Sequence, residues 1–325
     1  MWTWNFAAAL ALMGQMMLGT GISFAQNFPS KPIRFVTTSP GGSADIGARL
    51  VSQGLSGSVG QQVIVENRGG SSVIAAQIVA QAQPDGYTLL FFSDSIWILP
   101  FLQKNVGYDP VKDFAPVTSV GSAPTVLVVH PALPARSVME LIALAKAKPG
   151  ALNYSSGVAG GINHLAPEMF KAAAGVNITR IPFNNGAAAA LNSVIAGEVQ
   201  MMFPAVASGM PHVKTGRVRA LAVTSAQPTE LAPGIPTVAA SGLPGFEATL
   251  ILCVLAPAKT PAAVITQLNR EIGRIINGPE VKDRFFRAGI DIIASTPEQL
   301  AATMKTNMAK LGKVIKDAGI RGDSD

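Results

Sequence analysis

The chain has 325 residues, of which 48% are hydrophobic and 14% are charged, and its formal net charge is +6. This length suits two domains, or one large one, with ample core. The basic excess raises the question of nucleic acid, but the basic residues are scattered, with no basic patch interleaved with aromatics. The densest group (Lys305, Lys310, Lys313, Lys316 and Arg321) has helical spacing, so we interpret it as a solvated helix face and exclude nucleic acid as a partner.

The first 25 residues carry no charged side chain and contain an apolar run over residues 6–19. Residues 23–25 form a small-x-small sequence before Gln26, which is typical of signal-peptide cleavage. We therefore predict a signal peptide over residues 1–25 and a periplasmic protein, although the segment before the apolar run lacks Lys and Arg. An uncleaved membrane anchor is the alternative, but Gly14 and Gln15 interrupt the run, which is shorter than the ~20 apolar residues of a span.

The next segment predicts a strand, a glycine turn and a helix. Residues 33–37 are apolar and β-branched, Pro40, Gly41 and Gly42 end the strand, and a helix can begin near Ser43 or Asp45. Such a turn directs backbone N–H groups and a helix N-terminus toward one point, which favours a carboxylate without any basic side chain.

This alternation of strand and helix continues along the chain. Strands are predicted at 33–37, 63–66, 88–92, 126–129, 152–154, 178–182, 199–203, 218–223 and 250–255, and helices at 44–57, 73–82, 137–147, 162–174, 187–197, 208–214, 261–277 and 298–318. Ser137 and Glu140 are a predicted capping box for the helix over 137–147. The pattern predicts an α/β protein with mainly parallel sheets flanked by helices.

The chain is predicted to pass twice between two lobes. Residues 114–120 and 123–129 read as extended segments joined by Gly121 and Ser122, and a loop at 242–245 precedes the apolar strand 250–255. The first lobe is therefore discontinuous, comprising 27–123 and 232–325, and the second is 124–231. Two crossings make a hinge, and the cleft between lobes is where ligands bind, at the carboxyl ends of the strands.

Several predicted strand ends carry glycines or small polar residues that could surround a small ligand. The candidate ligand-binding residues are Ser39, Gly41, Gly42, Ser43 and Asp45 in the first turn, Ser93, Asp94 and Ser95 after strand 88–92, Ser156, Gly157, Gly160, Gly161, Asn163 and His164, then Phe183, Asn184, Asn185 and Gly186, and finally Pro204 and Ala205. Because a side chain would block the approach of the ligand and strain the turn, we expect Gly42→Val to abolish binding.

Motifs over nearly all of residues 27–321 resemble the substrate-binding proteins of tripartite tricarboxylate transporters, the Bug family. The matching segments are 28–34, 40–42 with Asp45, 65–68, 84–90, 108–117, 164–166, 216–224, 236–238 and 256–261. The resemblance implies a type II periplasmic binding protein that closes on a small carboxylate like a Venus flytrap. It implies delivery to the permease subunits of the transporter, or in some members to a sensor kinase, and contact of the turn at 39–45 with the ligand carboxylate.

Two loops depart from the family pattern. Residues 182–186 lack the basic residue common there, and the segment after strand 88–92 has Asp94, Ile96, Trp97 and Leu99 where glycine, histidine and asparagine are common. A site with Asp94 and no nearby Lys or Arg is poorly matched to a tricarboxylate. We therefore expect a monocarboxylate or a zwitterion, with Trp97 or Phe183 against an aromatic ligand. The alternatives are that Asp94 caps a helix and faces solvent and that Trp97 belongs to the core.

The remaining chemically active side chains indicate no catalytic or metal centre. Cys253 lies in an apolar strand and is predicted to be buried, and a single cysteine excludes an internal disulfide. His130, His164 and His212 are far apart in the sequence, which argues against a metal set, and His164 is interpreted as a helix-capping or hydrogen-bonding residue. Asp85 and Asp113 are expected to make local turn bonds.

An enzyme is the main rival class, but the chain has no Gly-x-Ser-x-Gly pentapeptide, Walker loop or dinucleotide fingerprint. A transcription-factor effector domain is disfavoured because no helix-turn-helix precedes it and an export signal does. We therefore predict a monomeric binding protein that needs no cofactor or metal. Presentation of the ligand to a sensor kinase stays open as an alternative to transport, and a periplasmic hydrolase is the less favoured reading.

Overall fold

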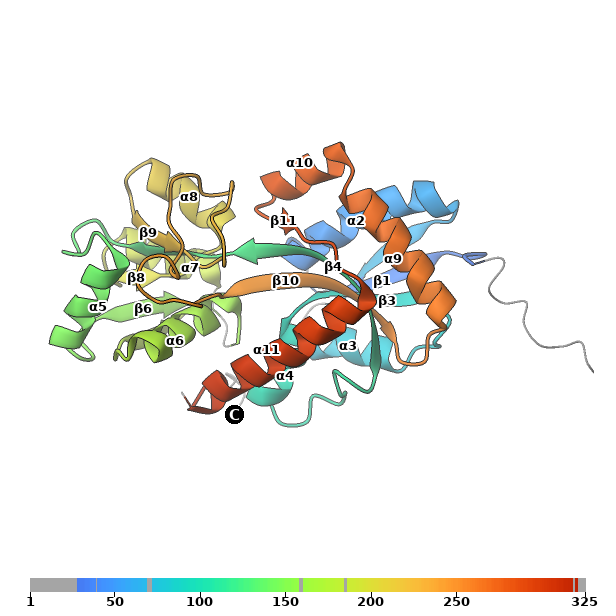
Figure 1. The fold of residues 1–325 in the computed structure, drawn as a ribbon, viewed down its shortest axis with the longest axis horizontal. Coiled ribbons are helices and arrows are strands. Elements are labelled where there is room, and N and C mark those ends of the chain that lie inside the picture. The colour runs from blue at the N-terminus through green and yellow to red at the C-terminus, as the bar shows by residue number, and fades with distance from the viewer. Residues whose placement is uncertain are drawn as a thin grey trace, which may run out of the picture.

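The computed structural model describes residues 28–38, 40–68, 72–157, 160–183, 186–317 and 319–320, and the predicted signal peptide lies outside these ranges. Each of two lobes is built around its own β-sheet, and two long strands join the lobes (Figure 1). The first sheet has the strand order β11-β4-β10-β3-β1-β2, and the second has the order β7-β6-β8-β5-β9. The predicted α/β architecture with two crossings is therefore present.

The first lobe begins with strand–helix units whose strands are parallel. The strands are β1 (Ile33–Thr37), β2 (Val63–Asn67) and β3 (Thr88–Ser93), and the helices that follow them are α2 (Ser43–Val59), α3 (Ser72–Ala80) and α4 (Ser95–Leu102). Strand β1 lies between β2 and β3 and pairs with both in parallel. The carboxyl ends of β1 and β3, and the helices that begin there, therefore lie at the same edge of the sheet.

The second lobe repeats this arrangement. Its strands are β5 (Val126–Val129), β6 (Asn153–Ser156), β7 (Thr179–Pro182), β8 (Met201–Met202) and β9 (Arg219–Val223), and its helices are α5 (Val138–Ala147), α6 (Ile162–Ala174), α7 (Ala187–Ile195) and α8 (Val206–Lys214). Strand β6 pairs in parallel with β7 and β8. The Ser137 hydroxyl accepts a hydrogen bond from the Glu140 N–H, so the predicted N-cap of α5 is confirmed. The Glu140 carboxylate accepts from Arg136 N, one residue before the N–H that a standard capping box uses, so the predicted capping box is only half formed.

Strands β4 (Phe114–Pro124) and β10 (Thr249–Pro257) run antiparallel to each other along the join between the lobes (Figure 1). Both sheets are therefore mixed, and the prediction of mainly parallel sheets holds only within the strand–helix units. The linking strands β4 and β10, and also β5, pair antiparallel to their neighbours. The residues at which each lobe ends stay a prediction.

The expected break at Gly121 and Ser122 is wrong, because β4 continues through both residues. A Cβ atom on Gly121 would lie 2.6 Å from Ile290 Cγ2 and 2.8 Å from the carbonyl oxygen of Asp291. The glycine therefore allows β11 (Asp291–Ile292) to approach β4 closely, and it does not form a turn.

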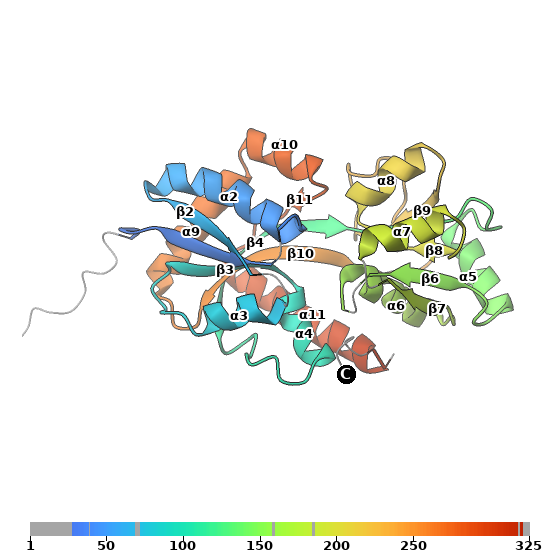
Figure 2. The ribbon, with the colours of Figure 1, turned by 180° about the vertical axis from the view of Figure 1, so that it is seen from behind.

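Three helices complete the first lobe: α9 (Ala262–Ile276), α10 (Pro279–Arg287) and α11 (Pro297–Asp317). The sequence did not predict α4 or α10. Helix α4 is apolar on nearly every side and includes Pro100, so it shows no amphipathic period, and α10 is short and highly polar. Figure 2 shows α11 running from the first lobe toward the second, and it contacts α4, β4 and α6.

The apolar cores lie on both faces of each sheet. In the first lobe one core lies between the sheet and α2 and α9, and another between the sheet and α3, α4 and α11. Leu165 of α6 joins the second of these cores, and Leu311 of α11 packs against a core of the second lobe, so apolar contacts link the lobes. Within the described ranges, no helix combines the length and the apolar character that crossing a membrane requires.

Candidate functional site

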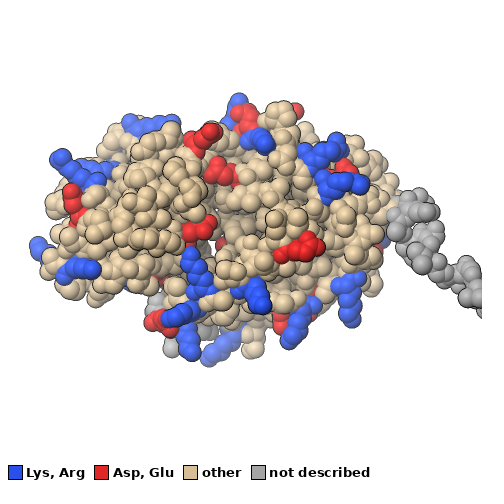
Figure 3. All heavy atoms as spheres, in the orientation of Figure 1, with Lys and Arg blue, Asp and Glu red and all other residues tan. Residues whose placement is uncertain are grey.

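A cavity of about 750 Å³ lies between the two lobes, and we call it the interlobe cavity. The end of β3 and the start of α4 line it from the first lobe, and the start of α6 lines it from the second. Residues 247–251 of the crossing chain and one face of α11 complete the wall. The surface is visibly hollowed between the lobes, and basic and acidic side chains are scattered around it (Figure 3).

The cavity brings together five of the candidate residues: Ser93, Asp94, Ser95, Gly160 and Gly161. Strand β3 carries the first three to its carboxyl end, and the turn after β6 carries the two glycines to the N-terminus of α6. The Ser93 and Ser95 hydroxyls are 2.8 Å apart and hydrogen-bonded to each other. These five residues come from both lobes, so a molecule in the cavity would contact both.

Asp94 is the N-cap residue of α4, but its side chain makes no capping hydrogen bond to the helix. Its backbone N–H donates to the Ile251 carbonyl at 2.8 Å, which ties the turn to β10. The partly buried carboxyl lines the cavity, so the alternative in which it faces bulk solvent is wrong. Burial raises the pKa of this carboxyl to about 7, although nearby backbone N–H groups oppose the shift. The alternative role of Trp97 is confirmed, because its side chain is fully buried in the core and does not line the cavity.

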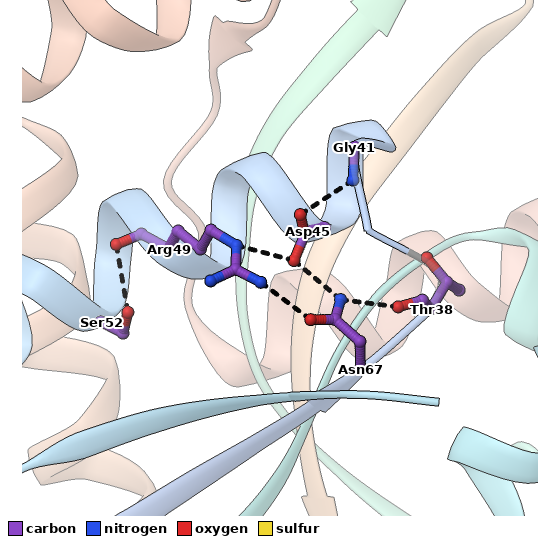
Figure 4. A network of polar contacts seen from close by, with 6 residues as sticks. All are labelled: Thr38, Gly41, Asp45, Arg49, Ser52 and Asn67. Atoms are coloured by element: carbon purple, nitrogen blue, oxygen red, sulfur yellow. Dashed lines mark hydrogen bonds and ion pairs between the residues drawn. The ribbon is translucent and has the colours of Figure 1, made fainter. Parts of the chain in front are cut away.

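The turn after β1 is held by a polar network centred on Asp45 (Figure 4). The Asp45 carboxylate accepts hydrogen bonds from Gly41 N at 2.9 Å, Arg49 Nε at 3.0 Å and Asn67 Nδ2 at 2.7 Å. Asn67 Nδ2 also donates to the Thr38 carbonyl. Burial acts to raise the pKa of Asp45, but these hydrogen bonds outweigh it and lower the pKa overall. The Asp45 carboxylate therefore stabilises the conformation of the turn.

The backbone strain at this turn falls on Gly41 and not on Gly42. Gly41 has φ +85°, whereas Gly42 is extended with φ −78° and ψ 164°. The expectation that Gly42→Val strains the turn is therefore wrong, and steric blocking of a ligand is the remaining basis for that substitution. Gly42 is the N-cap of α2 and offers no side-chain cap to its first N–H groups, and Ser43 begins the helix. Ser39 lies outside the described residues, and none of the described residues of this turn lines the interlobe cavity.

The turn before α6 is organised by its own side chains. His164 is buried and its Nδ1 accepts a hydrogen bond from Gly160 N at 3.1 Å, so the predicted hydrogen-bonding role is confirmed. This bond places the ring proton of a neutral His164 on Nε2. Gly161 is the N-cap of α6, with extended φ −70° and ψ 159° and no side-chain cap. The first peptide N–H groups of α6 therefore have no capping side chain where the helix meets the cavity.

Arg180 of β7 lies behind the same turn and corrects the expectation of a site without a nearby Arg. Its Nε donates to Ser156 Oγ at 2.7 Å and its Nη2 donates to the Gly157 carbonyl at 3.0 Å. A Cβ on Gly157 would lie 3.2 Å from Ala187 N and 3.4 Å from Asn163 Nδ2, so this turn packs against the start of α7. Arg180 could not be recognised from the sequence, because only the pairing of β6 with β7 brings it to Ser156.

The other candidates lie near their strand ends but do not line the cavity. Phe183 N donates to the Ser156 carbonyl, and Gly186 is the N-cap of α7. The Pro204 carbonyl accepts from Val126 N, and Ala205 is the exposed N-cap of α8. Asn184 and Asn185 lie outside the described residues.

Sequence reasoning missed the contribution of α11. Gln299, Thr303, Thr306 and Lys310 line the cavity, and their spacing places them on one face of the helix. This polar stripe was readable in the sequence, but nothing local indicates that α11 would lie across the crossing strands. Asp85 and Asp113 accept backbone hydrogen bonds from Tyr87 and Asp109, and Cys253 is fully buried, as predicted. The described residues contain no cluster of His, Cys, Asp and Glu suited to a metal ion.

The sequence matches the family described as the tripartite tricarboxylate transporter family receptor over residues 47–320. Protein BugT of Bordetella pertussis is 33% identical, covering 98% of this chain and 99% of its own length. A solved R. palustris protein, Rpa4515 with adipate, is 33% identical with a TM-score of 0.76, covering 90% of this chain and 99% of that one. The periplasmic binding protein BugD is 30% identical with a TM-score of 0.74 over the same shares of the two chains. The predicted two-lobed periplasmic-binding-protein fold is thereby confirmed.

Proposed function

This chain belongs to the tripartite tricarboxylate transporter receptor family, and from that membership we propose that it captures a small carboxylate between its lobes and delivers it to the membrane permease of such a transporter. The chain is a solute receptor and not an enzyme, as the sequence predicted. We place it in the periplasm because BugD is periplasmic and because residues 1–25 have the character of a signal peptide.

The interlobe cavity is the observation that carries this proposal. Gly160 and Gly161 line it, and they bring the uncapped N-terminus of α6 to its wall. The helix dipole and the first N–H groups favour a negative charge there. Its volume of about 750 Å³ lies within the range of small-molecule sites. The adipate in the R. palustris relative supports a carboxylate as the solute class.

Contacts across the gap support closure of the lobes on the solute. A Cβ on Gly160 would lie 2.4 Å from Leu102 Cδ1, so the turn before α6 rests against the end of α4. On another part of the gap, Gly289 packs against Ala207 at the start of α8, and the Thr229 hydroxyl donates to Asp291 Oδ2 at 2.8 Å. In both ribbon views the first turn of α2 points across the gap toward α7 (Figures 1 and 2). A solute that satisfies groups of both lobes would shift the population toward the closed state.

The test is calorimetry on protein purified from the periplasm, with adipate, malate, hexanoate and amino acids as probes. We expect at least one carboxylate to bind and to make the protein more compact in small-angle scattering. In Gly161→Val the new side chain would block the first N–H groups of α6 without straining the turn, because φ is −70°, and binding should be lost.

Gly57→Ala is the matched control, since it adds a Cβ at a helical glycine of α2 with open space around it. Its affinity should equal that of the unmodified protein. Full affinity in Gly161→Val, or a protein that binds only solutes without a carboxylate, would contradict the proposal.

A further inference from the structure

The interlobe cavity contains the carboxyl group of Asp94, which binding of a simple carboxylate solute does not explain. The turn after β3 places Asp94 on the cavity wall, while Gly160 and Gly161 occupy the wall contributed by the second lobe. In the proposed function the α6 N-terminus holds the solute carboxylate, whereas an ionised Asp94 in the same cavity would repel it. The presence of Asp94 in an anion-binding cavity therefore requires a separate explanation.

Asp94 has no cation to neutralise it. Among the residues that the structure describes, no Lys, Arg or His forms an ion pair with its carboxylate. The ionisable groups around it are the buried Cys253 thiol of β10 and, at the exposed rim, Glu247 before β10 and Lys310 of α11. Lys310 Nζ points to the Glu247 carbonyl at 3.4 Å. An acid that has backbone hydrogen bonds but no ion-pair partner among the described residues, and that borders a solute cavity, is suited to receive a positive group of the solute.

The remaining walls define the body of that solute. Leu99, Leu165 and Met169 are almost fully buried and line the cavity between its polar parts. Apolar atoms packed on them would gain the usual burial energy, whereas a second charge placed there would lose its hydration. The cavity thus combines a negative group, an anion-binding helix terminus and an apolar surface.

We infer that the solute is an amphipathic zwitterion, whose carboxylate meets the start of α6, whose ammonium group is received by Asp94, and whose apolar body packs on Leu99, Leu165 and Met169. This inference rests on the proposed function, because it takes the interlobe cavity as the solute site. It names the chemical class, an amino acid with an apolar side chain or spacer, and makes Asp94 the residue that determines specificity.

The experiment compares probes that differ only in the amino group. The pairs are 6-aminohexanoate with hexanoate, L-leucine with 4-methylpentanoate and L-phenylalanine with 3-phenylpropanoate, and adipate serves as the dicarboxylate. Each is titrated into the unmodified protein, Asp94→Asn and Glu247→Gln at pH 8. In at least one pair we expect the amino member to bind about tenfold or more tightly than its partner, a preference that Asp94→Asn abolishes and Glu247→Gln retains.

Solute that co-purifies from the periplasm, eluted and weighed by mass spectrometry, supplies the second readout. A solute that contains both an amine and a carboxyl supports the inference. A nitrogen-free carboxylate, or tight binding of adipate or hexanoate that Asp94→Asn leaves unchanged, overturns the inference while the proposed function stands. A solute with no carboxyl group overturns both.

Discussion

Replacing Asp94 with Asn should stabilise the solute-free protein at neutral and alkaline pH. Asn keeps the size of the side chain and an acceptor oxygen at the start of α4, but it removes the charge. Burial raises the pKa of Asp94 from 3.8 to about 7, so the folded state favours the neutral acid. Ionising this carboxyl in the folded protein therefore costs free energy, and the cost is absent from the variant.

The size of the effect follows from the shift. About three pKa units correspond to roughly 4 kcal/mol at ~1.4 kcal/mol per unit. Because the side chain retains partial contact with solvent, we reduce this to about 2 kcal/mol. The folded state binds the extra proton between the two pKa values, so the cost to the unmodified protein is absent below about pH 4, grows up to about pH 7 and then stays level.

The assay is urea unfolding of both proteins, freed of solute, at unit steps from pH 4 to pH 8. The difference in unfolding free energy should be near zero at pH 4 and reach about 2 kcal/mol in favour of Asp94→Asn at pH 8. Glu247→Gln, an exposed change at the rim of the same cavity, should stay within about 0.5 kcal/mol. A pH-independent difference, or a less stable Asp94→Asn at pH 8, would show that the carboxylate is stabilised by a partner and would refute the reasoning.

Further substitutions at Asp45, Gly41, Gly42 and Gly160 test the turns. Asp45→Ala should lower the unfolding free energy by about 2 kcal/mol at pH 7, because three hydrogen-bond donors lose their acceptor. Hydrogen bonds lower the pKa of Asp45 against the effect of burial, so the carboxylate stabilises the folded state above about pH 4. In urea titrations this stabilisation should decrease as the pH falls further. Gly41→Ala, at φ +85°, should cost about 1 kcal/mol in the same assay and Gly42→Ala much less, and equal costs would contradict the assignment of strain. Gly160→Ala should weaken solute binding about tenfold or more in calorimetry, because its Cβ would lie 2.4 Å from Leu102 Cδ1 and because φ is +80° at this position. Leu102→Ala in that background should restore the part of the loss that comes from the steric contact, and if it restores none, closure against α4 is not the cause.

The local patterns of the sequence predicted most of the strand–helix units. The ranges predicted for β1 and α6 match the structure, because β1 is a short β-branched apolar run followed by Pro40 and α6 lies between Gly161 and Gly175. Helix α4 was missed because a helix that is apolar on nearly every side has no polar face to reveal its period. Gly121 was misread as a junction between two extended segments because it allows the close approach of β11, which is remote in the sequence.

The candidate site was predictable only in part for a related reason. Strand ends followed by small residues are visible locally, and this pattern alone identifies Ser93, Asp94 and Gly160, which line the cavity. Residues that reach a site from a neighbouring strand or a distant helix have no such local pattern in the sequence. Arg180 and the polar face of α11 belong to that group.

By itself, the order of apolar runs, glycine turns and caps predicted strand–helix units and two crossings of the chain, because secondary structure follows from hydrophobic periodicity and short-range sterics. The function of a receptor was indicated only by the resemblance of the motifs to a known family. The tertiary structure alone decided which polar groups share a cavity and which form hydrogen bonds within their own turns. Asp45 and Asp94 look alike in the sequence, since both follow a strand and precede or begin a helix. The Asp45 carboxylate accepts hydrogen bonds from three donors, whereas the Asp94 carboxyl borders a cavity and forms no ion pair with the described residues, because burial and charge pairing depend on what the rest of the chain packs around each carboxylate.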